Sequence, residues 1–178
     1  MTSPWPFTRV PAAFPPLLRM SWQPSEAGQK RIDELVARYP SKMAACLPAL
    51  RLVQEETGWV SPDEQAWVAQ RLEIPLAHVQ GVVSFYTLYH REPVGKHVVQ
   101  VCRTLSCALL GGERLITHCE KKLGIKAGET TKDGKITLQH AECLASCGTA
   151  PALTVDDEFH ENMTLEKLDA LLERLRNT

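Results

Sequence analysis

The sequence predicts an α/β (α+β) chain, in which a small helical bundle precedes a small layer of helices packed on a sheet. Two observations predict this: apolar residues recur at helical spacing over residues 25–92, and strand-like and helical segments alternate over residues 96–178. The chain has 178 residues, of which 44% are hydrophobic and 23% are charged. This composition is that of an ordinary globular protein with enough chain to bury a core.

Residues 1–24 differ from the rest of the chain because prolines interrupt every apolar stretch in them. A secretory signal needs an unbroken apolar stretch of about 7 to 15 residues, and an organellar presequence should form an amphipathic helix. We expect residues 1–24 to be a flexible arm or an over-extended start, since Met20 lies just before the first structured segment. A partner-binding arm or a transit segment is the alternative.

Two helices are predicted over residues 25–57. The first begins at the capping residue Ser25 and ends at Tyr39-Pro40. The second spans residues 41–57, and Pro48 is tolerated there only with a kink or a late start. Helical spacing predicts these inward-facing residues: Ile32, Leu35, Val36 and Tyr39 in the first helix, and Met43, Leu47, Leu50 and Val53 in the second.

Two further helices complete the predicted four-helix bundle of residues 25–92. Ser61-Pro62-Asp63-Glu64 combines an N-cap, a proline at the first helical position and a glutamate three residues after the cap, which is the pattern of a capping box. This helix should end at Leu72. Ile74-Pro75 opens the fourth helix, which aligns Leu76, Val79 and Val83.

The remaining part, residues 96–178, should form a strand at His97–Val101, a helix at Ala108–Leu123 and a strand at Ile136–Leu138. Asp133-Gly134 is typical of a hairpin turn. Two short strands, Ala152–Val155 and Phe159–Asn162, then flank a turn at Asp156-Asp157, and Thr164 caps a last, leucine-rich helix.

Four of the six cysteines form two pairs in this second part: Cys102 with Cys107, and Cys143 with Cys147. Cys102 ends a predicted strand and Cys107 lies just before a predicted helix, whose dipole would favour a thiolate there. Loops at strand ends can wrap a metal centre, because backbone N–H groups in them are free to point at sulfur. We therefore treat these four residues as candidate metal ligands.

Three interpretations of the cysteine pairs compete. Disulfides are disfavoured, because the chain shows no export signal and its size makes such links unnecessary. Both spacings fit a tetrahedral four-cysteine zinc site, although zinc fingers favour closer pairs. A cluster of two irons and two sulfides takes two cysteines from each of two loops, and spacing alone favours it modestly.

The function classes that remain are limited by charge and motifs. Twenty Lys and Arg residues against 21 Asp and Glu give a net charge of −1, which argues against a nucleic-acid partner. No apolar run approaches the roughly 18 residues of a membrane span. No G-x-G occurs among the ten glycines, so we expect any nicotinamide or flavin site on a partner. A four-thiolate cluster has a low potential, about −400 mV in plant-type ferredoxins, which suits one-electron transfer near nicotinamide.

Several motifs together resemble a known family. They are Gly81-Val82-Val83-Ser84-Phe85-Tyr86, Val99-Gln100-Val101-Cys102 with Cys107, Gly128-Glu129-Thr130-Thr131-Lys132-Asp133-Gly134, Glu142-Cys143-Leu144 and Cys147-Gly148-Thr149-Ala150-Pro151. In combination they are similar to the 24-kDa subunits of respiratory complex I, known in bacterial NADH-quinone oxidoreductase as the E subunits. The resemblance covers the chain from about Ser25 onward. The small diaphorase subunits of NAD-linked hydrogenases and formate dehydrogenases share these motifs.

The resemblance implies a helical bundle followed by a thioredoxin-like ferredoxin domain with one 2Fe-2S cluster. It implies Cys102 and Cys107 as ligands of one iron and Cys143 and Cys147 as ligands of the other. It further implies electron transfer from NADH through FMN on a flavin-bearing partner subunit, contact with a larger iron-sulfur subunit, and a place in the cytoplasmic peripheral arm of a membrane-bound complex. A zinc-stabilised assembly module without redox function is the alternative from another class.

Two residues depart from the family pattern. Ala145 stands where glycine is usual, which matters if this position requires a positive φ, and Thr149 stands where asparagine is frequent. Outside the motifs, we expect Cys46 and Cys119 to be packing residues and Gly111-Gly112 to allow close packing near the first cysteine loop. We expect Phe85, Tyr86 and Tyr89 to lie in the bundle core or in interdomain contacts, or in part to face the flavin-bearing subunit.

Overall fold

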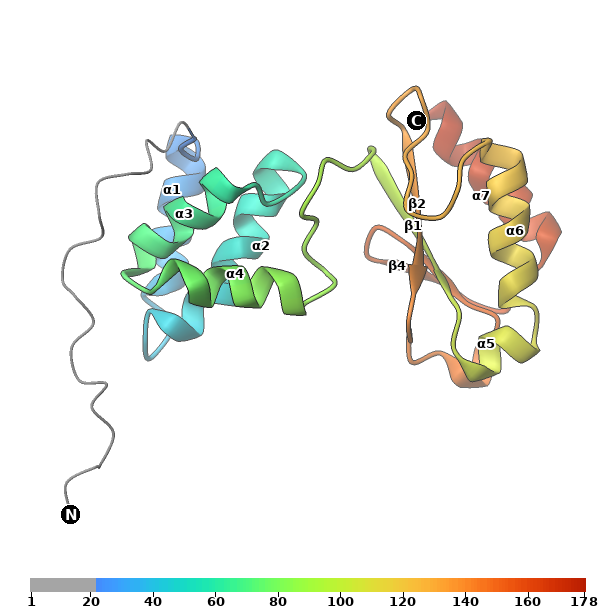
Figure 1. The fold of residues 1–178 in the computed structure, drawn as a ribbon, viewed down its shortest axis with the longest axis horizontal. Helices are drawn as coiled ribbons and strands as arrows, with labels where there is room; N and C mark the ends of the chain where they lie inside the picture. Colours follow the sequence, from blue (N-terminus) through green and yellow to red (C-terminus); the bar gives the residue numbers. More distant parts are fainter. Residues whose placement is uncertain (1–21) are drawn as a thin grey trace, which may run out of the picture. The chain divides into compact units, whose positions relative to one another are not determined.

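A computed structural model describes residues 22–178, in which the chain divides into two compact units, one ending at Glu92 and the other beginning at Pro93. Figure 1 shows the first unit as helices alone and the second as a sheet with helices. The α/β fold class is confirmed. The flexible arm expected over residues 1–24 lies outside the described residues, apart from its last three.

The first unit contains four α-helices, as predicted. They are α1 (Glu26–Val36), α2 (Cys46–Thr57), α3 (Pro62–Leu72) and α4 (Leu76–Phe85). Ser25 caps α1 by accepting a hydrogen bond from the Gly28 N–H at 3.0 Å. Ser61 and Glu64 form the complete capping box at the start of α3, which confirms that prediction.

Two details of the first two helices were predicted wrongly. The chain leaves helical geometry after Val36, so Tyr39 no longer follows the phase of α1 and is 40% exposed. Residues Met43–Ala45 form a short 3-10 turn before α2, and this turn rotates Met43 outward to 51% exposure. The late start places Pro48 in the first turn of α2. Backbone N–H groups in that turn have no carbonyl partner within the helix, so the lack of an N–H in proline costs no hydrogen bond there.

Polar side chains fasten the segment after α4 to α2 within this unit. The Tyr89 hydroxyl donates to the Leu47 carbonyl at 2.7 Å, and Gln54 bridges the Leu88 carbonyl and the His90 N–H. The surrounding core holds most of the buried apolar residues of the helices, among them Ile32, Leu50, Val53, Val68, Leu72 and Val79. The first unit thus has its own hydrophobic core.

The second unit is a four-stranded sheet in the order β2-β1-β3-β4. Its strands are β1 (His97–Cys102), β2 (Ile136–Ala141), β3 (Leu153–Val155) and β4 (Glu158–His160). Strands β1 and β2 are parallel, whereas the other pairs are antiparallel. In Figure 1, α6 (Gly112–Leu123) and α7 (Leu165–Asn177) lie side by side and cover one face of the sheet.

The helix predicted over residues 108–123 is in fact two helices, because glycines interrupt it. Helix α5 (Leu105–Leu109) ends before Gly111, which adopts a φ of 108°. A Cβ at Gly112 would lie 2.7 Å from the Cys102 carbonyl oxygen, so only glycine permits this approach. The prediction that Gly111-Gly112 serves close packing near the first cysteine loop is confirmed at Gly112.

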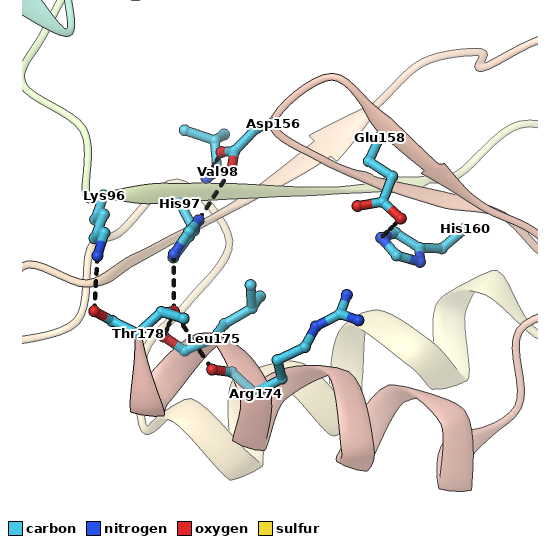
Figure 2. Close-up of polar contacts among 9 residues, drawn as sticks. All are labelled: Lys96, His97, Val98, Asp156, Glu158, His160, Arg174, Leu175 and Thr178. Carbon is cyan, nitrogen blue, oxygen red and sulfur yellow. Dashed lines mark hydrogen bonds and ion pairs between the residues drawn. The ribbon is translucent and has the colours of Figure 1, made fainter.

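The last helix is capped as predicted and its end is tied to the sheet. Thr164 accepts a hydrogen bond from the Lys167 N–H at the start of α7. At the other end, Figure 2 shows His97 between Asp156 and Thr178, with Nδ1 3.0 Å from the Asp156 carboxylate and Nε2 3.2 Å from the Thr178 hydroxyl. Asp156 also accepts a hydrogen bond from the Val98 N–H at 2.8 Å. These contacts join β1, α7 and the turn that precedes β4.

Candidate iron-sulfur site

The four candidate ligands lie on segments that meet at one edge of the sheet. Strands β1 and β2 are parallel, and Cys102 pairs with Ala141, so both segments leave the sheet at the same edge. The Arg103 N–H donates to the Ala141 carbonyl at 3.0 Å, and the Cys102 N–H donates to the Ala152 carbonyl at 3.2 Å. The loops after β1 and β2 and the segment before β3 are therefore held against one another.

Cys102 and Cys107 form the buried pair, each 3% exposed. They cluster with Ala152 under the partly buried side chains of Leu144 and Ala150. Cys107 lies inside α5 rather than just before a helix, because α5 begins at Leu105. This apolar surrounding limits the access of water to both sulfur atoms.

Burial acts to raise the pKa of both thiols in this pair, but their neighbours leave the two pKa values shifted in opposite directions. Burial raises the pKa of the Cys107 thiol, and the adjacent Cys102 raises it further. At Cys102, burial also acts to raise the pKa, but hydrogen bonds from Thr104 and from the Leu144 backbone outweigh it and lower the pKa. The helix dipole expected to favour the Cys107 thiolate is therefore not the dominant influence there.

Cys143 and Cys147 form the exposed pair on the loop that follows β2. The Cys143 sulfur accepts a hydrogen bond from the Ala145 N–H at 3.4 Å. Ala145 adopts a φ of 58°, which is the positive φ that would make glycine the favoured residue. Cys147 opens a 3-10 turn over Cys147–Thr149.

The chemistry of this edge fits a cluster bound by thiolates. Backbone N–H groups point at sulfur in both loops: those of Thr104 and Leu144 at Cys102, that of Ala152 at Cys107 and that of Ala145 at Cys143. Such donors stabilise thiolate ligands. Within residues 22–178, no three His, Cys, Asp or Glu side chains are arranged to hold a single metal ion. The ligand assignment therefore depends on the pairing and surroundings of the cysteines.

The two other cysteines lie apart from this edge. Cys46 is buried in the core of the first unit, and Cys119 is buried in the core beneath the sheet. Burial raises the pKa of Cys46 to about 11 and that of Cys119 to about 12, so both remain neutral thiols. Their positions are those expected of packing residues.

The aromatic residues at the end of α4 divide into two environments. Tyr89 is buried in the core of its own unit, as expected. Phe85 is 77% exposed and packs edge-to-face against Tyr86 at a ring-centroid distance of 5.0 Å. Phe85 and Tyr86 are thus not residues of the bundle core.

Sequence reasoning missed the polar residues that brace the cysteine loops. Arg103 pairs with Glu142, which links the first loop to the second. Glu161, which follows β4, accepts a hydrogen bond from the Thr149 hydroxyl at 2.5 Å. The sequence carries no local signal for either contact, since the partners are 39 and 12 residues apart.

Across the described helices, none is long and apolar enough to cross a membrane.

Comparisons with known proteins show the family of the chain. A family model described as thioredoxin-like 2Fe-2S ferredoxin matches residues 32–176. The chain is 43% identical over 148 residues to the second E subunit of NADH-quinone oxidoreductase from Rhizobium meliloti, covering 83% of this chain and 88% of the relative. It is 44% identical to NADH-quinone oxidoreductase subunit 2 of Thermus thermophilus, covering 83% of each.

Other similarities are partial. The chain is 39% identical to the E subunit of NADH-quinone oxidoreductase from Mycobacterium tuberculosis over 88% of its own length but only 63% of that relative. Among solved structures, an NAD+-reducing NiFe hydrogenase in the air-oxidised state superposes with a TM-score of 0.66 at 18% identity. This match covers 74% of our chain and 23% of the hydrogenase chain, so it bears on the fold alone. On its family match and its close relatives, the chain belongs to the thioredoxin-like 2Fe-2S ferredoxin family.

Proposed function

We propose that this chain is the iron-sulfur electron-transfer subunit of an NADH-quinone oxidoreductase. The observation that carries the proposal is that the segments carrying Cys102, Cys107, Cys143 and Cys147 meet at one sheet edge, in a chain whose relatives at 39–44% identity are named as subunits of that enzyme. These four residues hold one 2Fe-2S cluster, with Cys102 and Cys107 on one iron and Cys143 and Cys147 on the other. When bound, the cluster supplies a one-electron redox centre.

The residues of the chain give the two cysteine pairs different tasks. Cys102 and Cys107 provide thiolates on the buried side, where Leu144, Ala150 and Ala152 exclude water. Cys143 and Cys147 provide thiolates on the exposed side, which a redox partner can approach. Backbone N–H groups directed at three of the four sulfur atoms compensate negative charge on the thiolates and favour their ligand form.

The partners follow from the same assignment. Electrons arrive from NADH through FMN on a flavin-bearing subunit, and a larger iron-sulfur subunit of the same complex completes the NADH-oxidising module. The complex places the chain in the peripheral arm on the cytoplasmic face of the membrane. The names of the curated relatives support membership in this enzyme, whereas the hydrogenase similarity, at 18% identity, supports only a shared fold.

Cysteine substitutions test the ligand assignment. In the chain purified anaerobically, Cys143→Ala should abolish or destabilise the cluster, because it removes one of four thiolate ligands. Cys46→Ala is the matched control and should leave the visible spectrum unchanged, since Cys46 lies in the core of the first unit. A normal cluster spectrum in Cys143→Ala would show that the ligand assignment is wrong.

Reduction by NADH tests the electron-transfer role. NADH should bleach the visible absorbance of the cluster when the co-purified flavin subunit is present and should leave it unchanged when the chain is alone. A cluster that NADH cannot reduce in the presence of the flavin subunit would contradict the proposed partner. Stoichiometric zinc without iron would instead support the assembly-module alternative.

A further inference from the structure

The exposed cysteine loop is fastened at a point that lies outside both cysteine motifs. The segment between β4 and α7, residues 161–163, contacts the loop that contains Cys147 through its backbone and through one side chain. The Asn162 N–H donates to the Thr149 carbonyl at 2.7 Å, and the Met163 N–H donates to the Pro151 carbonyl at 3.0 Å. These two bonds fix the end of the 3-10 turn that Cys147 begins.

The Glu161 side chain reaches further into the loop than these backbone bonds. Its carboxylate accepts from the Thr149 hydroxyl at 2.5 Å and from the Ser146 side chain. Hydrogen bonds from Thr149 and then from Ser146 lower the pKa of Glu161, so the carboxylate stays ionised and accepts both bonds at neutral pH. One carboxylate thus contacts the residue before Cys147 and the residue two positions after it.

Burial of side chains does little to hold this loop, so its polar contacts are important. Cys143, Cys147 and Gly148 are exposed, and Ala145 carries an unfavourable positive φ. Leu144, next to Cys143, and Ala150, three residues after Cys147, nevertheless pack against the buried pair Cys102 and Cys107. The exposed cysteine therefore has to be kept near the buried pair by contacts of its neighbours in the chain.

From this arrangement we propose that Glu161 is a positioning residue of the cluster site: its carboxylate clamps Ser146 and Thr149 and thereby keeps Cys147 beside the buried cysteine pair. The inference rests on the proposed function only in that Cys147 is taken as a cluster ligand; the clamp itself is a property of the loop. Thr149 is one of the two departures from the family pattern, and in this chain its hydroxyl is the group that Glu161 binds.

Three variants of the full-length chain test the clamp. Glu161→Ala removes both hydrogen bonds, Glu161→Gln keeps an acceptor oxygen without the charge, and Thr149→Val removes one donor at nearly constant volume. Glu158→Gln is the matched control, because it removes the same charge three residues before Glu161, at the start of β4, where Glu158 lies near His160 (Figure 2).

Two readouts are measured on each variant. The first is amide hydrogen exchange over residues 146–149. It is recorded on the cluster-free chain, under conditions in which all variants have the same free energy of unfolding. The second is the rate at which the loaded chain releases iron to a chelator. We expect Glu161→Ala to accelerate both by about 3- to 10-fold, the range that the net contribution of one hydrogen bond represents. Thr149→Val should show a smaller increase, Glu161→Gln should partly restore the wild-type rates, and Glu158→Gln should match the wild type.

A reduction-potential measurement separates positioning from charge. Removing a unit charge at a distance of about 10 Å changes a reduction equilibrium about twofold in water-like surroundings, and Glu161→Gln and Glu161→Ala remove the same charge. A potential shift shared by both variants, with exchange and iron release faster in Glu161→Ala than in Glu161→Gln, would support the clamp. Wild-type rates in Glu161→Ala, or equal acceleration in Glu158→Gln, would overturn it.

The controls also cover the cases in which one measurement fails. If Glu161→Ala does not fold, Thr149→Val decides: faster exchange at residues 146–149 supports the clamp, and wild-type exchange overturns it. If the wild-type chain holds no iron, the proposed function fails, whereas the exchange readout still tests the clamp. The two failures are therefore distinguishable.

Discussion

Ala145 is the residue whose backbone conformation conflicts most directly with its side chain. It lies at a φ of 58° between the two exposed cysteines, where a Cβ costs about 1–2 kcal/mol relative to glycine. We expect Ala145→Gly to raise the free energy of unfolding by about 1 kcal/mol, measured by urea denaturation of the cluster-free chain. Ala170→Gly, in the exposed interior of α7, should instead lower it by about 1 kcal/mol. A destabilised Ala145→Gly would contradict the strain assigned to this position.

Gly112 is the opposite case, because its lack of a side chain is required. A Cβ there would meet the backbone carbonyl oxygens of Cys102 at 2.7 Å and Cys107 at 2.9 Å, neither of which can move without displacing a candidate ligand. Gly112→Ala should destabilise the chain by about 2–3 kcal/mol and reduce cluster occupancy. Gly81→Ala is the control, since nothing lies within 4 Å of its added Cβ in α4 and it should be neutral or stabilising. Full cluster occupancy in Gly112→Ala would contradict the close approach.

At the scale of elements, a polar contact between α6 and α7 should make stability depend on pH. His118 Nε2 lies 2.7 Å from the Asp169 carboxylate, and Lys122 lies 3.2 Å from it. The bond to His118 and the neighbouring Lys122 lower the pKa of Asp169. Because this pKa is lowered in the folded chain, the stabilisation is present above the unfolded value of about 3.9 and is lost as the pH falls below it.

The Asp169→Asn variant tests this contact. Its urea midpoint should be lower than that of the wild type at pH 7, and the difference should shrink as the pH falls from 5 toward 2. Asp157→Asn removes an acidic side chain from the turn before β4 and serves as the control outside the two helices. A difference between Asp169→Asn and the wild type that stays constant with pH would show that the His118 contact is not responsible.

Helix starts and turns were predicted correctly where they depend on interactions between residues that are close in the sequence. The capping box at Ser61 and Glu64, the cap at Thr164 and the Asp133-Gly134 turn all depend on residues within a few positions. The break at Gly111 was missed because apolar residues lie on both sides of the glycines, at Ala108–Leu110 and at Leu115-Ile116. The full length of β2 depends on its pairing with β1, which a short segment cannot encode.

In the candidate site, too, features that depend on neighbouring residues were predicted and contacts between distant residues were not. The two cysteine pairs were found because each pair sits next to a strand or helix end, which the sequence indicates. The braces were not found, because Arg103 meets Glu142 and Thr149 meets Glu161 only after the sheet has formed. The unequal burial of the two pairs likewise depends on β3 delivering Ala152 to the edge.

For the whole molecule, cysteine reactivity should separate the six thiols into classes. In the native cluster-free chain at pH 8, Cys143 and Cys147 should be alkylated first, because they are exposed. Cys46 and Cys119 should remain unmodified until the chain unfolds, because they are buried and burial raises their pKa to about 11 and about 12. Peptide mass spectrometry reads out each site, and rapid native labelling of Cys119 would contradict its place in the core.

The central claim, that the chain carries one 2Fe-2S cluster for electron transfer, is tested most directly by electron paramagnetic resonance of the anaerobically purified full-length chain. The brown protein should contain about two irons per chain and, on reduction by dithionite, should give the signal of a one-electron-reduced cluster. The same sample with a stoichiometric zinc content, no colour and no paramagnetic signal would contradict the claim.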